Sequence, residues 1–263
     1  MRLNCYPVRM PHRKKMVKVA LVTVLVGLLA TAAIASESHA VSYHSGPETV
    51  HAMLYKPKGK GPFPALVVIH EWWGLNGWVK QQAAKYADQG YVTLAIDLYR
   101  GQVATTPDQA HEIMRGVPED RANRDLLAAV TYLNSLTTVN PKKLGVIGWC
   151  MGGGYALDLA IADPKLKVAV INYGHLATED ATLKKIHASV LGIFGGKDQG
   201  IPVDSVKAFE AQMKALDKKV EIHIFPDAGH AFENPGNGQG FRPEDATQAE
   251  KITQDFLEKN LKY

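Results

Sequence analysis

The stretch that decides the fold joins an apolar run to a run of small residues through one cysteine: Val146-Ile147-Gly148-Trp149-Cys150-Met151-Gly152-Gly153-Gly154. The apolar pattern predicts a buried strand from Lys143 to Trp149 and a helix from Met151 to Ala162. Glycines two positions before and after Cys150 are typical of the G-x-nucleophile-x-G elbow, a sharp turn from a strand into a helix. We expect positions 148 and 152 to require glycine, because any side chain there would collide with the neighbouring strand or helix.

Two interpretations of Cys150 follow from this stretch alone. The predicted helix points its first backbone N–H groups and the positive end of its dipole at the sulfur, which favours a thiolate and then an oxyanion. Cysteines outside disulfides are also often buried and inert, so a structural cysteine in a glycine-rich turn is the alternative. The rest of the chain has to decide between a nucleophile and a structural residue.

The order of basic and apolar residues in the first forty positions predicts that the protein is exported. Five basic side chains between Arg9 and Lys18 precede an uncharged apolar run from Val19 to Ala35, and small residues continue to Ala40. This order predicts a secretory signal peptide, residues 1–40, with cleavage after Ala35 or Ala40. An uncleaved membrane anchor is the alternative, although the run is short for spanning a bilayer. We expect a secreted, periplasmic protein that has no stable membrane association after cleavage.

Removal of this segment changes both the charge and the cysteine count. Residues 1–40 hold six of the 30 Lys and Arg residues and one of the 26 Asp and Glu residues, which leaves 24 basic and 25 acidic residues. The net charge of about −1 indicates no nucleic-acid partner. Cys5 is removed as well, so Cys150 remains as a lone thiol in an oxidising compartment. A thiol without an intramolecular partner there is either buried or kept free for its reactivity.

Strands and helices alternate along residues 41–263. Apolar runs bounded by turn residues predict buried strands at 65–70, 91–97, 143–149, 168–173, 190–194 and 220–225, and an edge strand at 49–56. Helical periodicity predicts helices at 77–89, 119–136, 151–162, 205–217 and 244–261. This alternation predicts a single α/β domain, with a mostly parallel central sheet and helices on both faces. The active site should lie at the carboxyl ends of the strands.

Two loops supply partners for a cysteine nucleophile. Asp198 follows the predicted strand 190–194, and His230 follows the strand 220–225, so both lie at the same end of the sheet as the elbow. A histidine there can act as the base, and an acid can fix its tautomer. Asp227 competes with Asp198 for the role of the acid. A helix-capping aspartate and a surface histidine are the structural alternatives.

The loop after strand 65–70 contains Glu71, which is either a functional acid or a solvated loop residue. In this architecture the same loop provides one backbone N–H of the oxyanion hole, so we expect the N–H groups of Trp72 and Met151 to form the hole. A zinc site of the form H-E-x-x-H is excluded, because position 74 is glycine. We expect neither a metal nor a cofactor.

These motifs together resemble the dienelactone hydrolase family of α/β hydrolases, over essentially the whole of residues 49–261. The resemblance is carried by His70-Glu71-Trp72-Trp73-Gly74-Leu75-Asn76, Asp97-Leu98-Tyr99-Arg100-Gly101, Gly148-Trp149-Cys150-Met151-Gly152-Gly153 and Gly229-His230-Ala231-Phe232. It implies the α/β-hydrolase fold, with Cys150 as nucleophile, His230 as base and Asp198 as orienting acid. It further implies that Glu71 contacts the resting thiol and moves when substrate enters.

The sequence departs from this family at the substrate clamp. Family members that open dienelactone grip its carboxylate with two arginines, one of them four residues after the catalytic histidine, and that position is Asn234 here. The other arginine would correspond to Arg100, which is one residue out of register and is alternatively a surface residue. An aromatic pocket wall is expected instead, for which the candidate residues are Trp72, Trp73, Tyr99 and Tyr173.

The expected activity is that of a dienelactone hydrolase-like carboxylic-ester hydrolase acting on a small-molecule lactone or activated ester through a thioester acyl-enzyme. A thiolate is a good leaving group as well as a good nucleophile, so stabilised leaving groups are favoured over the amines that peptides release. A broad carboxylesterase or thioesterase is one alternative. A non-hydrolytic thiol redox or ligand-binding protein on the same fold is another. We expect a monomer.

Overall fold

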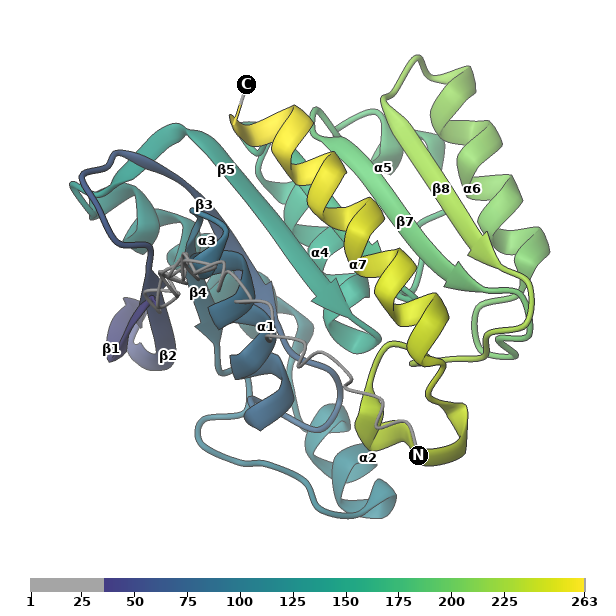
Figure 1. The fold of residues 1–263 in the computed structure, drawn as a ribbon, viewed down its shortest axis with the longest axis horizontal. Coiled ribbons are helices and arrows are strands. Elements are labelled where there is room, and N and C mark those ends of the chain that lie inside the picture. The colour runs from purple at the N-terminus through teal and green to yellow at the C-terminus, as the bar shows by residue number, and fades with distance from the viewer. Residues whose placement is uncertain (1–35, 263) are drawn as a thin grey trace, which may run out of the picture. The chain divides into compact units, whose positions relative to one another are not determined.

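The computed structural model describes residues 36–262, so most of the predicted signal peptide lies outside the described residues. Its strands form one eight-stranded sheet in the order β1-β2-β4-β3-β5-β6-β7-β8. Their bounds are β1 Glu37–Ser45, β2 Glu48–Lys56, β3 Phe63–Ile69, β4 Val92–Ile96, β5 Val139–Trp149, β6 Val168–Asn172, β7 Ser189–Gly195 and β8 Val220–Phe225. The pairs from β4 to β8 are parallel, while β1 and β2 pair antiparallel at one side (Figure 1).

The helices connect these strands. Their bounds are α1 Gly77–Asp88, α2 Pro107–Arg115, α3 Glu119–Ser135, α4 Met151–Ala162, α5 Asp180–Leu183, α6 Val203–Ala215 and α7 Pro243–Leu257, with a short 3-10 segment at Pro235–Gly240 and a π-helical turn at Glu258–Lys262. Among residues 36–262, none of the helices is both long and apolar enough to cross a membrane. The alternation of these helices with the strands of a mostly parallel sheet confirms the predicted α/β class.

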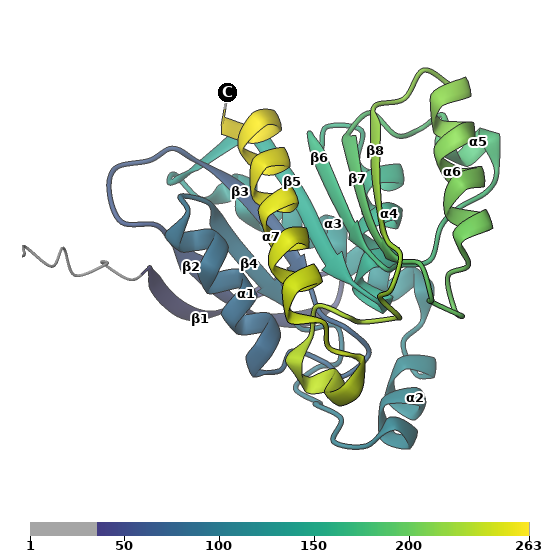
Figure 2. The same ribbon diagram turned by 45° about the vertical axis from the view of Figure 1, so that its right-hand side comes forward.

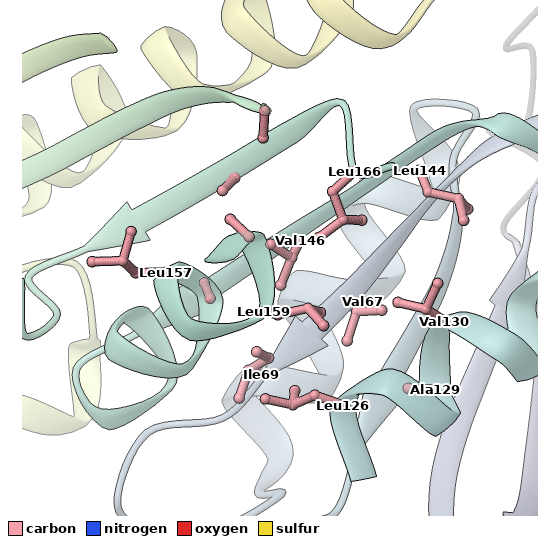
Figure 3. Packing of buried hydrophobic residues seen from close by; sticks show 14 of the residues in the cluster. Val67, Ile69, Leu126, Ala129, Val130, Leu144, Val146, Leu157, Leu159 and Leu166 are labelled. Carbon is pink, nitrogen blue, oxygen red and sulfur yellow. The ribbon is translucent and has the colours of Figure 1, made fainter. Parts of the chain in front are cut away.

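Helices cover both faces of the sheet, and each face has its own apolar layer. Side chains of α3, α4 and α6 pack on one face, where Leu126, Leu157 and Phe209 are fully or almost fully buried. Side chains of α1 and α7 pack on the other face, where Val79 and Leu257 are fully buried. Figures 1 and 2 show α1 and α7 in front of the sheet, and Figure 3 shows the α3 and α4 layer against β3 and β5. Strands covered on both faces explain the continuous apolar runs in the sequence.

The edge of the sheet differs from the sequence prediction. The strand expected at the edge is β2, and β1 lies outside it, paired along its whole length from Glu37–Lys56 to Ser45–Glu48. Most side chains of β1 are exposed, so the strand carries no apolar run by which the sequence could reveal it. Residues 37–40, which would be lost by cleavage after Ala40, belong to this strand.

The turn between β5 and α4 is built on close backbone contacts. Cys150 has φ 54° and ψ −119°, a strained conformation for a residue with a side chain. A Cβ atom at Gly148 would overlap the backbone carbonyl of Gly152, and one at Gly152 would lie 2.5 Å from the carbonyl oxygen of His70. Both glycines are therefore required for the turn, as the sequence predicts.

Alanine substitutions should separate this requirement from a general preference for glycine. Gly148→Ala should lower the free energy of unfolding by about 2–3 kcal/mol, because its Cβ meets rigid backbone. Gly77→Ala is the matched control: Gly77 is exposed at the start of α1, and a Cβ atom added there would have no neighbouring atom within 4 Å. This control should be neutral or stabilising by up to about 1 kcal/mol. Urea unfolding checks both values, and equal stability of the two variants would contradict the packing argument.

Candidate active site

Four loops at the carboxyl ends of parallel strands carry the residues that the sequence singles out. Glu71 follows β3, Cys150 follows β5, Asp198 follows β7 and His230 follows β8. Parallel strands end at one edge of the sheet, and the arrowheads of β5, β7 and β8 point to the same end of the molecule (Figure 1). Residues far apart in the sequence therefore meet in one place.

Three of these side chains form a continuous chain of contacts. Cys150 Sγ lies 3.1 Å from His230 Nε2, and His230 Nδ1 lies 2.7 Å from Asp198 Oδ2. The other carboxylate oxygen of Asp198 accepts hydrogen bonds from the backbone N–H groups of Gly200 and Ile201, at 2.8 and 3.1 Å. Asp198 is 5% exposed and therefore has a fixed position.

The competing acid is placed elsewhere. Asp227 is exposed, and its carboxylate forms an ion pair with Lys197 Nζ at 2.7 Å. Of the two aspartates, only Asp198 has a recorded contact with His230.

Burial and pairing act in opposite directions on the charges of this chain of contacts. Burial favours the neutral form of Asp198, but the hydrogen bonds from His230 and from the backbone outweigh it and lower the pKa of Asp198. Burial likewise opposes protonation of His230, but the contacts with Asp198 and Cys150 outweigh it and raise the pKa of His230 well above its ordinary value. A positively charged imidazole next to the sulfur stabilises a thiolate.

Neighbouring residues hold the imidazole in position. The ring of Tyr173 contacts the His230 ring edge to face, with 5.3 Å between ring centroids. Asn237 Nδ2 donates hydrogen bonds to the carbonyl oxygens of His230 and Ala231, at 2.8 and 3.1 Å. Tyr173 is fully buried. It therefore packs against His230 and does not form the pocket wall that the sequence suggested.

The backbone N–H groups of Trp72 and Met151 have no recorded acceptor within the part of the chain that the structure describes. Gly152 lies against the carbonyl of His70, so the first turn of α4 packs on the end of β3. His70 is fully buried; its Nε2 accepts a hydrogen bond from the Leu98 N–H at 3.2 Å, so its Nδ1 donates to the Glu71 carbonyl at 2.6 Å.

Glu71 has a different partner from the one that the family resemblance implies. It is 1% exposed, and its Oε2 accepts a hydrogen bond from Asn234 Nδ2 at 2.5 Å, while its Oε1 is buried without a recorded partner. Cys150 instead has His230 as its recorded partner, so the expected contact between Glu71 and the resting thiol is not found. Burial raises the pKa of Glu71 to about 7, against the opposing effects of Asn234 and His230.

The expected role of Arg100 in substrate binding is corrected by the structure. Its guanidinium forms ion pairs with Glu48 at 2.7 Å and with the fully buried Asp125 at 2.8 Å. It does not line the cavity that contains Cys150. Tyr99 is also only a supporting residue: it is 2% exposed, and its hydroxyl contacts Met151 Sδ at 3.2 Å.

A cavity of about 380 Å³ opens at Cys150 and His230. Trp72 and Trp73 form part of its wall as predicted, and Glu71 and Asn234 are its buried polar residues. His111, which was not among the predicted site residues, also lines the cavity; it comes from α2 and packs edge to face on Trp72 with 4.8 Å between ring centroids. No sequence motif surrounds His111. It reaches the site through the tertiary packing of α2, which the sequence does not reveal. The residues lining this cavity include neither lysine nor arginine.

The fold and the placement of these loops are those of an α/β hydrolase. A crystal structure of a Klebsiella pneumoniae protein provisionally named a dienelactone hydrolase superposes with a TM-score of 0.77 at 26% identity, covering 85% of this chain and 98% of that one. A dienelactone hydrolase-like promiscuous phosphotriesterase from metagenomic libraries superposes with a TM-score of 0.80 at 24% identity, covering 86% and 99%.

The sequence profile of the dienelactone hydrolase family matches residues 50–261, so the chain belongs to this family and is a dienelactone hydrolase-like hydrolase. A Methylorubrum extorquens protein provisionally named carboxymethylenebutenolidase is 31% identical over 215 residues, which cover 76% of this chain and 74% of the relative. A Bradyrhizobium protein provisionally named 2-oxo-3-(5-oxofuran-2-ylidene)propanoate lactonase is 32% identical over 223 residues, covering 80% and 89%. The predicted family is confirmed.

The buried position of Glu71 should be visible in the stability of the protein. An unfolded glutamate has a pKa of about 4.3, and the folded value is about 7, so the folded protein keeps a proton that the unfolded chain has lost between these values. The wild type should therefore lose stability as the pH rises through this window. Glu71→Gln should remove this loss, on the order of 3 kcal/mol between about pH 5 and about pH 8, as measured by urea unfolding.

The comparison also includes an effect on a neighbouring acid. Burial raises the pKa of Glu233 to about 8 and the charge of Glu71 raises it further, so Glu71→Gln removes the titration of Glu71 together with its effect on Glu233. Glu112→Gln, at an exposed position of α2, should leave the pH dependence of the wild type unchanged. Parallel stability curves for the wild type and Glu71→Gln would contradict a buried, protonated Glu71.

Proposed function

We propose that the protein hydrolyses lactones or activated carboxylic esters, with Cys150 as nucleophile, His230 as general acid and base, and Asp198 as orienting acid. One observation carries this proposal: Cys150 Sγ contacts His230, and His230 contacts Asp198, at 3.1 and 2.7 Å. The backbone N–H groups of Trp72 and Met151, which have no recorded acceptor among the described residues, are the candidates for the oxyanion hole. A nucleophile, a base with an orienting acid, and an oxyanion site are the parts that acyl transfer requires.

Acylation uses the charged form of the pair. The thiolate of Cys150 attacks the carbonyl carbon, and the carbonyl oxygen becomes an oxyanion that accepts hydrogen bonds from the N–H groups of Trp72 and Met151. Collapse of this intermediate breaks the ester C–O bond, and His230 Nε2 gives its proton to the departing oxygen. The products are an alcohol, or the hydroxyl end of an opened lactone, and a thioester on Cys150.

Deacylation reverses the proton transfer. Neutral His230 accepts a proton from water as the water oxygen attacks the thioester carbonyl. Collapse of the second tetrahedral intermediate breaks the C–S bond and releases the carboxylic acid, which leaves the thiolate and the imidazolium as they began. Asp198 keeps the imidazole in the tautomer that both steps need, because its carboxylate accepts a hydrogen bond from Nδ1–H.

The site favours uncharged over anionic substrates. No lysine or arginine lines the cavity at Cys150, and Asn234 provides an amide where a clamp arginine would supply charge. The Bradyrhizobium relative is named as a lactonase, which supports a lactone as one substrate class. An oxoester or lactone is also favoured by the chemistry of the thiolate, since an amine leaves less readily than the sulfur itself.

Single substitutions test the proposed roles. Cys150→Ala and His230→Ala should each lower kcat for an activated aryl ester by about 10³-fold or more. Asp198→Asn should also lower kcat strongly, because the imidazole loses its orienting acceptor. Asp227→Asn is the matched control from the neighbouring loop and should keep the wild-type kcat.

Mass spectrometry of the protein mixed with a slow ester should detect one acyl group on Cys150. Retention of most of the activity by Cys150→Ala would exclude the proposed nucleophile. Oxidised forms of Cys150 without any acylated form would instead favour a thiol redox protein.

We also propose that the protein is exported and cleaved after Ala35. The strand β1 begins at Glu37, so this site leaves the strand complete, whereas cleavage after Ala40 would remove its first four residues and their pairing with β2. N-terminal sequencing of the periplasmic protein should therefore begin at Ser36. A sequence that begins at Val41 would contradict this choice, and an uncleaved chain would contradict the proposed signal peptide.

A further inference from the structure

A second hollow adjoins Cys150 on the side away from His230. It has a volume of about 510 Å³, and Trp72 and Cys150 line both this hollow and the first one. His230, by contrast, lines only the first hollow. The sulfur thus lies where two hollows meet, and the indole of Trp72 borders both.

The position of His230 distinguishes the two hollows chemically. In the proposed reaction His230 donates its proton to the leaving oxygen, so the leaving group has to occupy the hollow that His230 lines. The acyl group remains attached to the sulfur and extends to the other side. The second hollow is therefore the place for the acyl chain.

One face of α4 forms the floor of the second hollow. Met151, Gly154, Tyr155 and Asp158 line it, and their spacing of three or four residues places them on the same side of the helix. The helix rises by about 1.5 Å per residue, so Asp158 lies about 10 Å along the axis from Met151. Gly154 contributes no side chain, and His175 packs close to it: a Cβ atom added at Gly154 would lie 3.5 Å from the Cβ of His175. The wall is mainly apolar, as an acyl chain requires.

Asp158 is the acidic residue of the second hollow, and His175 is the basic side chain that lines the same hollow. Its carboxylate has no recorded hydrogen bond or ion pair within residues 36–262, and no lysine or arginine lines this hollow. Burial and, after it, the charge of Glu119 raise the pKa of Asp158 to about 6, while His175 acts in the opposite direction. A partly buried carboxylate that lacks a partner gains from a cation brought to it.

We propose that the second hollow binds the acyl arm of the substrate and that Asp158 selects acyl chains with a positively charged group at the end away from the reacting carbonyl. This inference rests on the proposed ester hydrolysis. It assigns Asp158 to substrate selection, at a distance from the bond that breaks. An anionic end group would meet Asp158 and would be rejected.

A series of p-nitrophenyl esters tests this assignment, with graded acyl chains that end in a trimethylammonium group, in its uncharged tert-butyl isostere or in a carboxylate. The assay is run at about pH 8, above the pKa of Asp158, so that its carboxylate is charged. At the best chain length, kcat/KM of the wild type should be about tenfold higher for the cationic ester than for the uncharged isostere. The anionic ester should have the lowest kcat/KM. Asp158→Asn should reduce the ratio of cationic to neutral kcat/KM to near one.

Asp120→Asn is the control, because Asp120 is exposed on α3 and lines neither hollow, and it should keep the wild-type ratio. High salt should lower the ratio in the wild type, a measurement that does not depend on the folding of any variant. A wild-type ratio near one, a ratio that salt does not change, or an unchanged ratio in Asp158→Asn would overturn the role of Asp158. Failure of the proposed hydrolysis is distinct: the wild type would then turn over none of the esters and form no acyl-enzyme at Cys150.

Discussion

Close contact between backbone segments at the turn after β5 is the constraint on which the site depends. Gly148 and Gly152 lie too near each other and β3 to accept a Cβ, and the Cys150 N–H donates to the Asn172 carbonyl on β6 at 3.0 Å. These contacts hold the backbone of Cys150 in a strained conformation, with φ 54° and ψ −119°. The position of the sulfur therefore depends on backbone packing and on the absence of side chains at the two glycines.

Two carboxylates near the sulfur are paired with neutral groups. Glu71 is buried, Glu233 is partly buried, and the charge of Glu71 further raises the pKa of Glu233 after the larger effect of burial. Their recorded partners are the Asn234 amide and the Trp149 indole N–H, at 2.5 and 3.3 Å. Burial thus favours the protonated form of both acids. His230 is the positive group next to the sulfur, so the site has little charge to offer an anionic substrate.

The sequence predicted the parts of this protein that follow from local pattern. Buried strands have continuous apolar runs, and the glycine spacing around Cys150 is dictated by a turn of only a few residues, so both are visible without a structure. β1 was missed because its exposed face carries no apolar run. The partners of Arg100 and Glu71 could not be predicted, because Asp125 and Asn234 reach them only through packing of segments distant in the sequence. The order of the strands along the chain indicated which loops lie close together, but not which of their side chains form hydrogen bonds or ion pairs.

The loop after β8 carries two kinds of residue within five positions. His230 contacts Cys150 Sγ, and Asn234 lines the same cavity, while Asn237 donates two hydrogen bonds to the carbonyl groups of His230 and Ala231. A substitution at position 234 would change the polarity of the cavity, and it would also remove the hydrogen bond that the Gly236 N–H donates to Asn234 Oδ1 at 2.8 Å. The lining of the cavity and the shape of the loop are therefore linked at this position, so a replacement that alters the lining must also be one that the loop tolerates.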